Sequence, residues 1–295
     1  MNTPHITTRD WLIYSTISIV WGTSFILIKQ GLLYFDPLTV SALRISISGL
    51  LLMPFALKGL YRLSNKQKIF AVLMGLTGSG IPSFLYPLAQ QHIDSGVAGV
   101  LNSLTPIFIV VNGFIFFNVR YTRMQLSGIA AGFIGAALLI ILHHKPTESD
   151  TNNYIYGLVI VSATFLYGLS NQILVHFLKG LDAIVITSVA FFFMGIMAAG
   201  ILTQTEFIAV LKHNPDAWRG VLYVTLLAGL GSALAMVLYN YLAARTGVTF
   251  SGTVTYVMPV VALMWSVVAG EFIGMQHIAA MLIILVGVYL VRRTI

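Results

Sequence analysis

Ten long apolar runs, separated by short polar segments, follow one another along this 295-residue chain. A helix needs about 20 mostly apolar residues to cross the hydrocarbon core of a membrane, and each run is close to that length. We therefore predict membrane-spanning helices near 11–34, 38–57, 69–89, 96–117, 125–143, 154–177, 183–203, 219–242, 248–270 and 276–292. The first run is too long for a signal-peptide core and lacks a small-residue cleavage site, so we expect it to be retained.

The same residues recur in the two halves of the chain. At an offset of 153 residues, Gly78-Ser79 recurs as Gly231-Ser232, Tyr86 as Tyr239, Gly99 as Gly252 and Pro106 as Pro259. At an offset of 146 residues, Trp21 aligns with Tyr167, Gly22 with Gly168, Ser24 with Ser170 and Asp36 with Asp182. Duplicated halves of five apolar helices are typical of membrane transporters. We predict a first repeat over 1–144, a linker over 145–153 and a second repeat over 154–295.

Composition supports a membrane protein. Hydrophobic residues make up 58% of the chain and charged residues only 8%, whereas soluble domains carry about a quarter charged residues. The formal net charge of +7 would suggest nucleic-acid binding in a soluble protein, but basic residues also collect in the cytoplasmic loops of membrane proteins. We therefore expect lipid, and no nucleic acid, as a partner. The absence of cysteine excludes disulfides, thiolate metal sites and a cysteine nucleophile.

The charges also orient the helices. With the N-terminus in the cytoplasm, eleven Lys and Arg residues fall in cytoplasmic segments and only three, Lys145, Lys212 and Arg219, fall outside. This asymmetry predicts a multi-pass protein of the bacterial inner membrane with both termini cytoplasmic. Because each repeat has an odd number of helices, the second must be inverted relative to the first. The expected fold is all-α, with ten transmembrane helices in two inverted five-helix repeats.

Two cations lie inside predicted spans. Lys29 and Arg44 would each cost about 2.5–3.5 kcal/mol or more if they faced lipid near the bilayer centre. Both lie roughly 8–9 Å below the outer ends of their helices, from the rise of an α-helix, so an anion is expected between them. It is either a protein carboxylate, of Asp36, Asp94 or Glu271, or a substrate carboxylate or phosphate. Snorkelling to the outer interface would also satisfy Lys29.

No Asp or Glu lies near the middle of any predicted span. Exporters that exchange cationic drugs for protons usually need a buried carboxylate, so the sequence favours a facilitator, or a carrier of anionic or zwitterionic solutes. His92 and His176 titrate in the right range to move protons, but both lie near helix ends, where a solvated histidine is the simpler interpretation.

The spans near 96–117 and 248–270 are candidates for the transport pathway. Pro106 and Pro259 each remove a backbone donor and free the carbonyl four residues earlier, at Asn102 and Thr255. A free carbonyl at membrane depth must face protein or water. The two prolines predict either a pair of kinks that line a central cavity or a packing seam of small residues, and the sequence alone leaves both open.

Aromatic and amide side chains supply further candidates. Tyr86 and Tyr239 suit gating or stacking on a flat solute, although tyrosine also anchors helices at the membrane interface. Asn171 lies well inside its span and needs a partner in the protein or in a wet cavity. The predicted substrate-pathway residues are Trp21, Ser24, Phe25, Lys29, Arg44, Ser83, Tyr86, Asn102, Thr105, Pro106, Tyr167, Asn171, Tyr239, Thr255, Tyr256 and Pro259.

Several of these stretches are similar to a known family. Trp21-Gly22-Thr23-Ser24-Phe25, Lys29, Asp36-Pro37 and Arg44 resemble the opening of the drug/metabolite transporter superfamily, in particular its ten-helix EamA-type members. The runs 96–106 and 248–259 resemble the fourth and ninth helices of that family, and Gly270-Glu271 also fits. The first repeat departs from the pattern, because Asn118 stands where the second has Glu271. The resemblance implies a transporter of amino acids, other metabolites or drugs.

We therefore predict a transporter of small polar metabolites, with amino acids or related solutes favoured, that works by alternating access through a central cavity. A sugar-nucleotide or other anionic-metabolite exchanger stays open, as does a receptor or assembly subunit without transport. Zinc, nucleophile-elbow, P-loop and dinucleotide motifs are all absent from the sequence, so we predict neither an enzyme nor a cofactor or metal. The sequence leaves a homodimer open.

Overall fold

The computed structural model describes residues 6–118, 122–143, 153–246, 248–271 and 273–292, and these residues form helices and turns without a β-strand. In chain order the helices are α1 (Thr8–Gly31), α2 (Pro37–Arg62), α3 (Asn65–Gly75), η1 (Leu76–Gly80), α4 (Ile81–Gln90), α5 (Ser95–Asn102), α6 (Thr105–Phe117), α7 (Arg123–His143), α8 (Asn153–Phe177), α9 (Ala183–Leu202), α10 (Phe207–His213), α11 (Ala217–Leu226), η2 (Leu227–Leu234), α12 (Ala235–Thr246), α13 (Val248–Ser251), α14 (Val254–Val268) and α15 (Met275–Arg292). The segments η1 and η2 are π-helical.

Every predicted apolar run coincides with helical structure, but not every run is one continuous helix. In the described part of the chain, seven stretches are long and apolar enough to cross a membrane. An eighth is the pair α5 and α6, which is bent by 40°. The helix α14 and the apolar part of α15 are shorter. The fold is therefore that of a multi-helix membrane protein, and ten spans remain a prediction.

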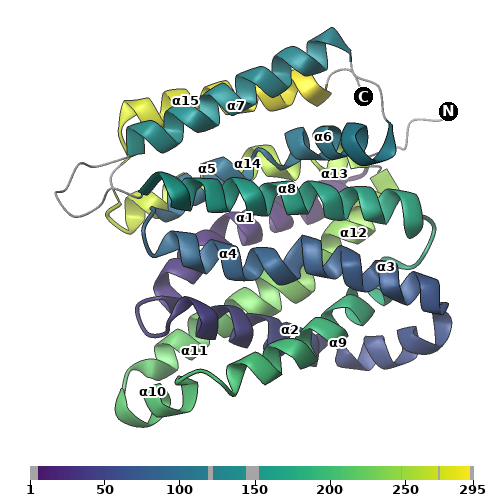
Figure 1. Cartoon of the computed structure of the whole chain (residues 1–295), viewed down its shortest axis with the longest axis vertical. Helices are drawn as coiled ribbons and strands as arrows, with labels where there is room; N and C mark the ends of the chain where they lie inside the picture. The colour runs from purple at the N-terminus through teal and green to yellow at the C-terminus, as the bar shows by residue number, and fades with distance from the viewer. Residues whose placement is uncertain (1–5, 119–121, 144–152, 247, 272, 293–295) are drawn as a thin grey trace.

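The helices pack so that the two halves of the chain are interleaved. Two pairs lie at opposite edges, α2 with α9 and α7 with α15 (Figure 1). Between these edges, α1 packs mainly on α12 and α14, whereas α8 packs mainly on α4 and α6. The first helix of each half thus contacts mostly helices of the other half. We call α1, α12 and α14 the α1 group, and α4, α6 and α8 the α8 group. Both halves of the chain together form the central space between these two groups.

Glycines allow the edge pairs to approach closely. A Cβ atom on Gly49 of α2 would lie 2.7 Å from the carbonyl oxygen of Phe191 and 2.8 Å from Cα of Gly195, both on α9. Similarly, a Cβ on Gly128 of α7 would lie 2.6 Å from the carbonyl oxygen of Gly287 on α15. Because water does not drive helices together inside a membrane, such backbone contact supplies much of the packing energy.

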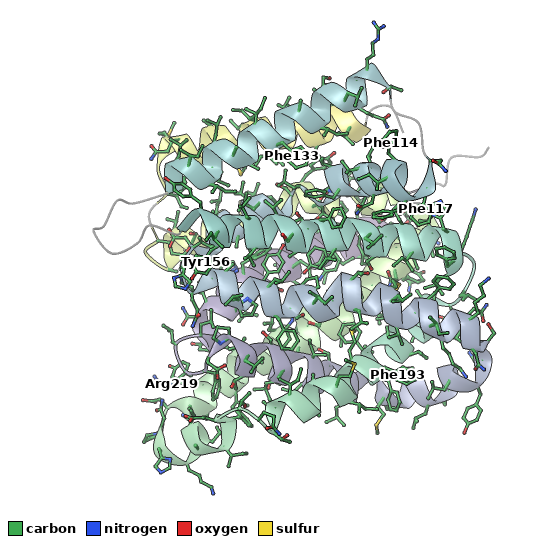
Figure 2. All side chains as sticks on the ribbon, viewed as in Figure 1. Phe114, Phe117, Phe133, Tyr156, Phe193 and Arg219 are labelled. Atoms are coloured by element: carbon green, nitrogen blue, oxygen red, sulfur yellow. The ribbon has the colours of Figure 1, made fainter. Side chains whose placement is uncertain are left out.

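The outer surface of the bundle is apolar. Phe114, Phe133 and Phe193 project from the ribbon, and each has more than a third of its surface exposed (Figure 2). A soluble protein rarely shows apolar surface on this scale, whereas lipid chains cover it at no cost.

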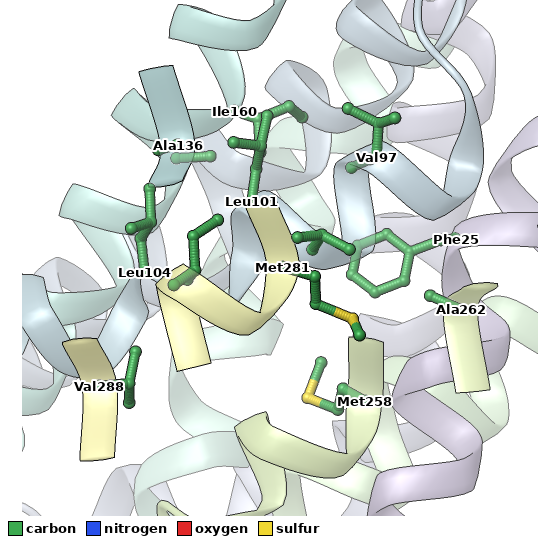
Figure 3. Packing of buried hydrophobic residues seen from close by; sticks show 14 of the residues in the cluster. Phe25, Val97, Leu101, Leu104, Ala136, Ile160, Met258, Ala262, Met281 and Val288 are labelled. Carbon is green, nitrogen blue, oxygen red and sulfur yellow. The ribbon is translucent and has the colours of Figure 1, made fainter. Parts of the chain in front are cut away.

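The interior contains one large apolar cluster that joins both halves. Leu101 of α5, Ile160 of α8, Met258 of α14 and Met281 of α15 belong to this cluster (Figure 3). At the end of the bundle near the N-terminus, the Asp10 carboxylate accepts a bond of 2.6 Å from Nε of Arg245. This ion pair connects the start of α1 to the end of α12.

We expect Gly49→Ala to destabilise the protein by about 1–3 kcal/mol, since the new methyl group meets the backbone of α9, which cannot move aside. Unfolding in mixed detergent micelles measures the effect. Gly200→Ala is the matched control, because a Cβ at that exposed position of α9 has no neighbour within 4 Å. Equal stability of the two variants would contradict the backbone contact between α2 and α9.

Candidate functional site

A cavity of about 140 Å³ lies in the central space between the α1 and α8 groups. Its wall is formed by residues of α1, α2, α3, α4, α5, α6, α8, α9, α12 and α14 and of the π-helical segments η1 and η2. Both halves of the chain therefore contribute to the wall. Eleven of the sixteen residues predicted for the pathway line this cavity: Trp21, Ser24, Phe25, Arg44, Tyr86, Asn102, Thr105, Tyr167, Asn171, Tyr239 and Thr255.

The other five predicted residues, Lys29, Ser83, Pro106, Tyr256 and Pro259, are not part of this wall. Tyr256 donates a hydrogen bond of 3.2 Å to the carbonyl oxygen of Val288 on α15, so its hydroxyl is directed at the edge pair. Pro106 lies in the first turn of α6 and Pro259 lies inside α14, and both side chains are buried. Ser83 of α4 is buried outside the cavity.

The helix break near Pro106 has a different form from the expected kink. The chain leaves α5 at Asn102 and re-enters a helix at Thr105, so the break precedes the proline, which occupies the first turn of a new helix. The carbonyl oxygen of Asn102 accepts a hydrogen bond of 2.8 Å from the Thr105 hydroxyl. A neighbouring side chain thus satisfies the carbonyl at the break.

Lys29 has a partner outside the cavity. Its ammonium group donates hydrogen bonds of 2.8 Å and 3.2 Å to the carbonyl oxygens of Gln90 and Ile93, at the end of α4. Helix ends expose unpaired carbonyls and carry partial negative charge, so a cation is favoured there. The structure therefore separates the two membrane cations, and only Arg44 lines the cavity.

Two aromatic pairs lie on the cavity wall. The ring centroids of Trp21 and Tyr239 are 5.1 Å apart, and those of Tyr86 and Tyr167 are 6.0 Å apart. Trp21 aligns with Tyr167, and Tyr239 with Tyr86, at the two offsets found in the sequence. The same aromatic contact is therefore made twice, once in each group of helices.

The π-helical segments make a second pair of matching contacts. Gly78 in η1 abuts the side chain of Ser170, leaving no room for a Cβ atom. Gly231 in η2 likewise abuts Ser24, with a Cβ placed 2.6 Å from its Oγ. These residues align between the halves at the same offsets. Each Gly-Ser sequence therefore marks a point where a π-helical turn meets the first helix of the other half.

A π-helical turn disturbs the regular hydrogen-bond ladder, and π-helical segments are frequent at functional sites. Here side chains from other helices bond the carbonyls around it. Ser170 donates to the carbonyl oxygen of Met74, just before η1, at 2.8 Å. Trp21 Nε1 donates to the carbonyl oxygen of Gly231, within η2, at 2.9 Å. Ser170 and Trp21 both line the cavity, so the cavity wall and the helix interruptions stabilise each other.

Polar side chains on the wall bond either to each other or to backbone carbonyls. The Tyr86 hydroxyl donates to Oδ1 of Asn102 at 2.6 Å, and Nδ2 of Asn240 donates to the Thr187 hydroxyl at 2.6 Å. Nδ2 of Asn171 donates to the carbonyl oxygen of Tyr167 in its own helix, at 3.0 Å. The wall therefore carries amide and hydroxyl groups in defined orientations.

Sequence reasoning omitted several wall residues from the predicted set. Ser232 and Asn240 are polar residues within an apolar run, and this signal was available. Thr187 of α9 gave the same signal, whereas Ala190 and Phe191 carry none, because they are apolar residues in an apolar run. Only the packing of α9 against α2, α3 and α12 places them at the cavity.

Glu271 also has a defined partner. Its carboxylate accepts hydrogen bonds from the backbone N–H of Ser95 at 3.0 Å and from the Ser95 hydroxyl at 2.7 Å, and from the Ser266 hydroxyl. It thus caps the N-terminus of α5, where a negative charge is favoured. Neither Lys29 nor Arg44 pairs with it in the described part of the chain. Over the same residues, no group of three or more His, Asp or Glu side chains could hold a metal ion.

The sequence profile of the EamA-like transporter family matches this chain twice, over residues 11–141 and 155–293. Together these matches include most of the chain. The protein belongs to the EamA-like transporter family, which is part of the drug/metabolite transporter superfamily, and it is a membrane transporter. The predicted resemblance is thereby confirmed.

Curated relatives agree with this assignment. The chain is 25% identical over 281 residues to the uncharacterized inner membrane transporter YedA of Escherichia coli K12, with 92% of this chain and 87% of the relative aligned. It is 25% identical over 272 residues to a probable terminal-alkyne amino-acid exporter of Streptantibioticus cattleyicolor, with 90% of this chain and 85% of the relative aligned. An uncharacterized transporter of Archaeoglobus fulgidus is 27% identical over 154 residues, about half of either chain.

A solved crystal structure has a similar fold. It aligns with 97% of this chain, and 98% of its own chain is covered, with a TM-score of 0.60 and 18% sequence identity. At this identity the likeness concerns the fold alone.

We expect Lys29→Met to lower the free energy of unfolding by about 1–3 kcal/mol, since two carbonyls at the end of α4 lose their charged donor. Unfolding in mixed detergent micelles measures this loss. Lys66→Met is the control, because Lys66 is an exposed lysine at the start of α3. A Lys29→Met protein as stable as the control would show that these hydrogen bonds contribute nothing to the fold.

Proposed function

We propose that this protein carries small polar metabolites across the bacterial inner membrane by alternating access. The observation that supports this most directly is the central cavity, whose wall is built from both halves of the chain. In this mechanism the α1 group and the α8 group rock against each other and expose the cavity to each side of the membrane in turn. Export is the direction that the amino-acid exporter among the relatives suggests.

We further propose that the fold consists of ten transmembrane helices in two inverted repeats, over 1–144 and 154–295. Three observations support this organisation. The family profile matches the chain twice, once in each predicted repeat. The aromatic pair Trp21–Tyr239 has its counterpart in Tyr167–Tyr86, and η1 has its counterpart in η2. The linker 145–153 falls almost wholly outside the described residues.

The size of the cavity favours a small substrate. Sites for drug-sized ligands have volumes of about 300–1,000 Å³. The present cavity has about 140 Å³, which suits a solute of the size of an amino acid. A sugar nucleotide is far larger, so the volume disfavours that alternative in this conformation.

Counterflow in proteoliposomes tests the proposal. Vesicles containing the purified protein are loaded with unlabelled amino acids, small organic acids, sugars or purines, and uptake of the matching tracer is followed with and without a proton gradient. We expect accumulation for one class of small solute that persists without the gradient, because no acidic side chain lines the described cavity. If none of these solutes moves while the protein is correctly folded, the proposed transport function is wrong.

We expect Tyr239→Ala to reduce counterflow about fivefold, since one ring of an aromatic pair on the cavity wall is lost, a contact worth roughly 1 kcal/mol beyond its buried area. Initial tracer rates at equal protein content give the measurement. Tyr289→Ala is the matched control, because Tyr289 lies on α15 away from the cavity and is 56% exposed. An equal counterflow rate for both variants would contradict the assignment of Tyr239 to the transport pathway.

The proposed orientation can be tested directly because the chain contains no cysteine. We expect His213→Cys, at the end of α10, to react with a membrane-impermeant maleimide added outside intact cells. We expect Lys66→Cys, at the start of α3, to react only after the membrane is opened. Both positions are exposed in the structure. The reverse labelling pattern would place both termini outside the cytoplasm.

A further inference from the structure

We propose that Arg44 binds a carboxylate group of the transported solute, so that the substrate is a small monoanion or zwitterion and cations are excluded. This inference rests on the proposed transport function and assigns a chemical class to its substrate. It depends on the partners of Arg44, on the residue at the matching position of the other half and on the charges of the whole cavity wall.

The Arg44 side chain has free capacity for an anion. Its Nε donates one hydrogen bond, of 2.8 Å, to the Ser232 hydroxyl at the cavity wall. A guanidinium group has five N–H donors, arranged as a planar fork that fits a carboxylate with two parallel bonds. Among the described residues no carboxylate forms an ion pair with Arg44. A substrate carboxylate would supply the missing partner inside the cavity.

The scaffold itself does not require an arginine at this position. Asp36 and Asp182 cap α2 and α9 with matching bonds, to the N–H groups of Leu38 and Ile184, which fixes the alignment of the two helices at an offset of 146 residues. In this alignment the counterpart of Arg44 is Ala190. Ala190 also lines the cavity and is only 1% exposed. The second half therefore has an alanine at the equivalent position of the wall, so the packing of the helix does not account for the charge of Arg44.

The rest of the described wall carries no opposing charge. Arg44 is the one ionised side chain among the wall residues, which are otherwise aromatic, aliphatic, hydroxyl or amide. Lys29, the other cation within the membrane, is held by the carbonyls at the end of α4. In a site of low dielectric constant, one uncompensated positive charge attracts an anion and repels a cation strongly.

The wall also has groups for a zwitterion. The amides of Asn102, Asn171 and Asn240 line the same cavity, and amide oxygens accept hydrogen bonds from an ammonium group. An amino acid would thus place its carboxylate at Arg44 and its ammonium group among neutral acceptors. An amine without a carboxylate would meet the positive charge with nothing to offset it.

Equilibrium binding to the purified protein tests this inference without depending on transport. The probes are L-phenylalanine, 3-phenylpropionate, L-phenylalaninamide and 2-phenylethylamine, which share a ring and differ in their charged groups. Quenching of tryptophan fluorescence and thermal stabilisation are the readouts, since Trp21 lies on the cavity wall. We expect the two carboxylates to bind the wild type at least about tenfold more tightly than the amide and the amine, as the loss of a charge-assisted hydrogen bond predicts.

We expect Arg44→Gln to abolish this preference and Arg44→Lys to retain part of it, because lysine keeps the charge but not the planar fork. Arg219→Gln is the control for net charge, since Arg219 is exposed and pairs with Asp216 away from the cavity. Circular dichroism and size-exclusion elution establish that each variant is folded.

Two results would overturn the inference. One is a folded Arg44→Gln protein that binds the carboxylates as tightly as the wild type. The other is a wild type that binds the amine or the amide at least as tightly as the carboxylates. If either occurs while counterflow of some solute persists, the carboxylate anchor is wrong and the transport function stands. Carboxylate binding that depends on Arg44, without flux of any solute, would support the anchor and contradict transport.

Discussion

Inside a lipid bilayer every backbone polar group must find a partner within the protein, and the central cavity depends on this constraint. The helix interruptions at the π-helical segments η1 and η2 and at the break between α5 and α6 all contribute residues to the cavity wall. Carbonyls at each interruption accept bonds from side chains, such as Ser170 to Met74 and Trp21 to Gly231. At the cavity, α1 and α8 thus supply side-chain donors to the interrupted helices of the other half.

Much of this arrangement could be predicted from the sequence. The duplication predicted which residues are equivalent, and the aligned pairs Trp21–Tyr239 and Tyr167–Tyr86 make equivalent contacts in the structure. The π-helical turns could not be predicted, because a Gly-Ser sequence in an apolar run is compatible with a regular helix. The role of Lys29 could not be predicted either, since its partners are carbonyls at the end of a helix distant in sequence. Composition contains no information about such contacts.

The two halves of this protein make similar packing contacts but differ in their charged residues. The edge pairs, the helix caps and the aromatic contacts follow the repeat, so the scaffold uses both halves in the same way. The charged residues do not follow the repeat, because Arg44 corresponds to Ala190 and Glu271 corresponds to Asn118. The interactions that form the cavity are thus separate from the single charge inside it. A change at Arg44 would alter which solutes bind without removing a contact that the repeat supplies twice.

The family assignment rests on the profile match to both halves, whereas the proposed substrate class rests on Arg44. The family profile matches both halves, and the helices that pack the halves together are the parts that both halves share. These helices enclose the cavity, but the contacts that they share contain no charge that would distinguish one class of solute from another. The proposed choice rests on Arg44, a wall position at which the two halves differ in charge. In a cavity of about 140 Å³, Arg44 is the one ionised side chain of the described wall, and under the proposed carboxylate binding its sign would decide the class of solute that enters.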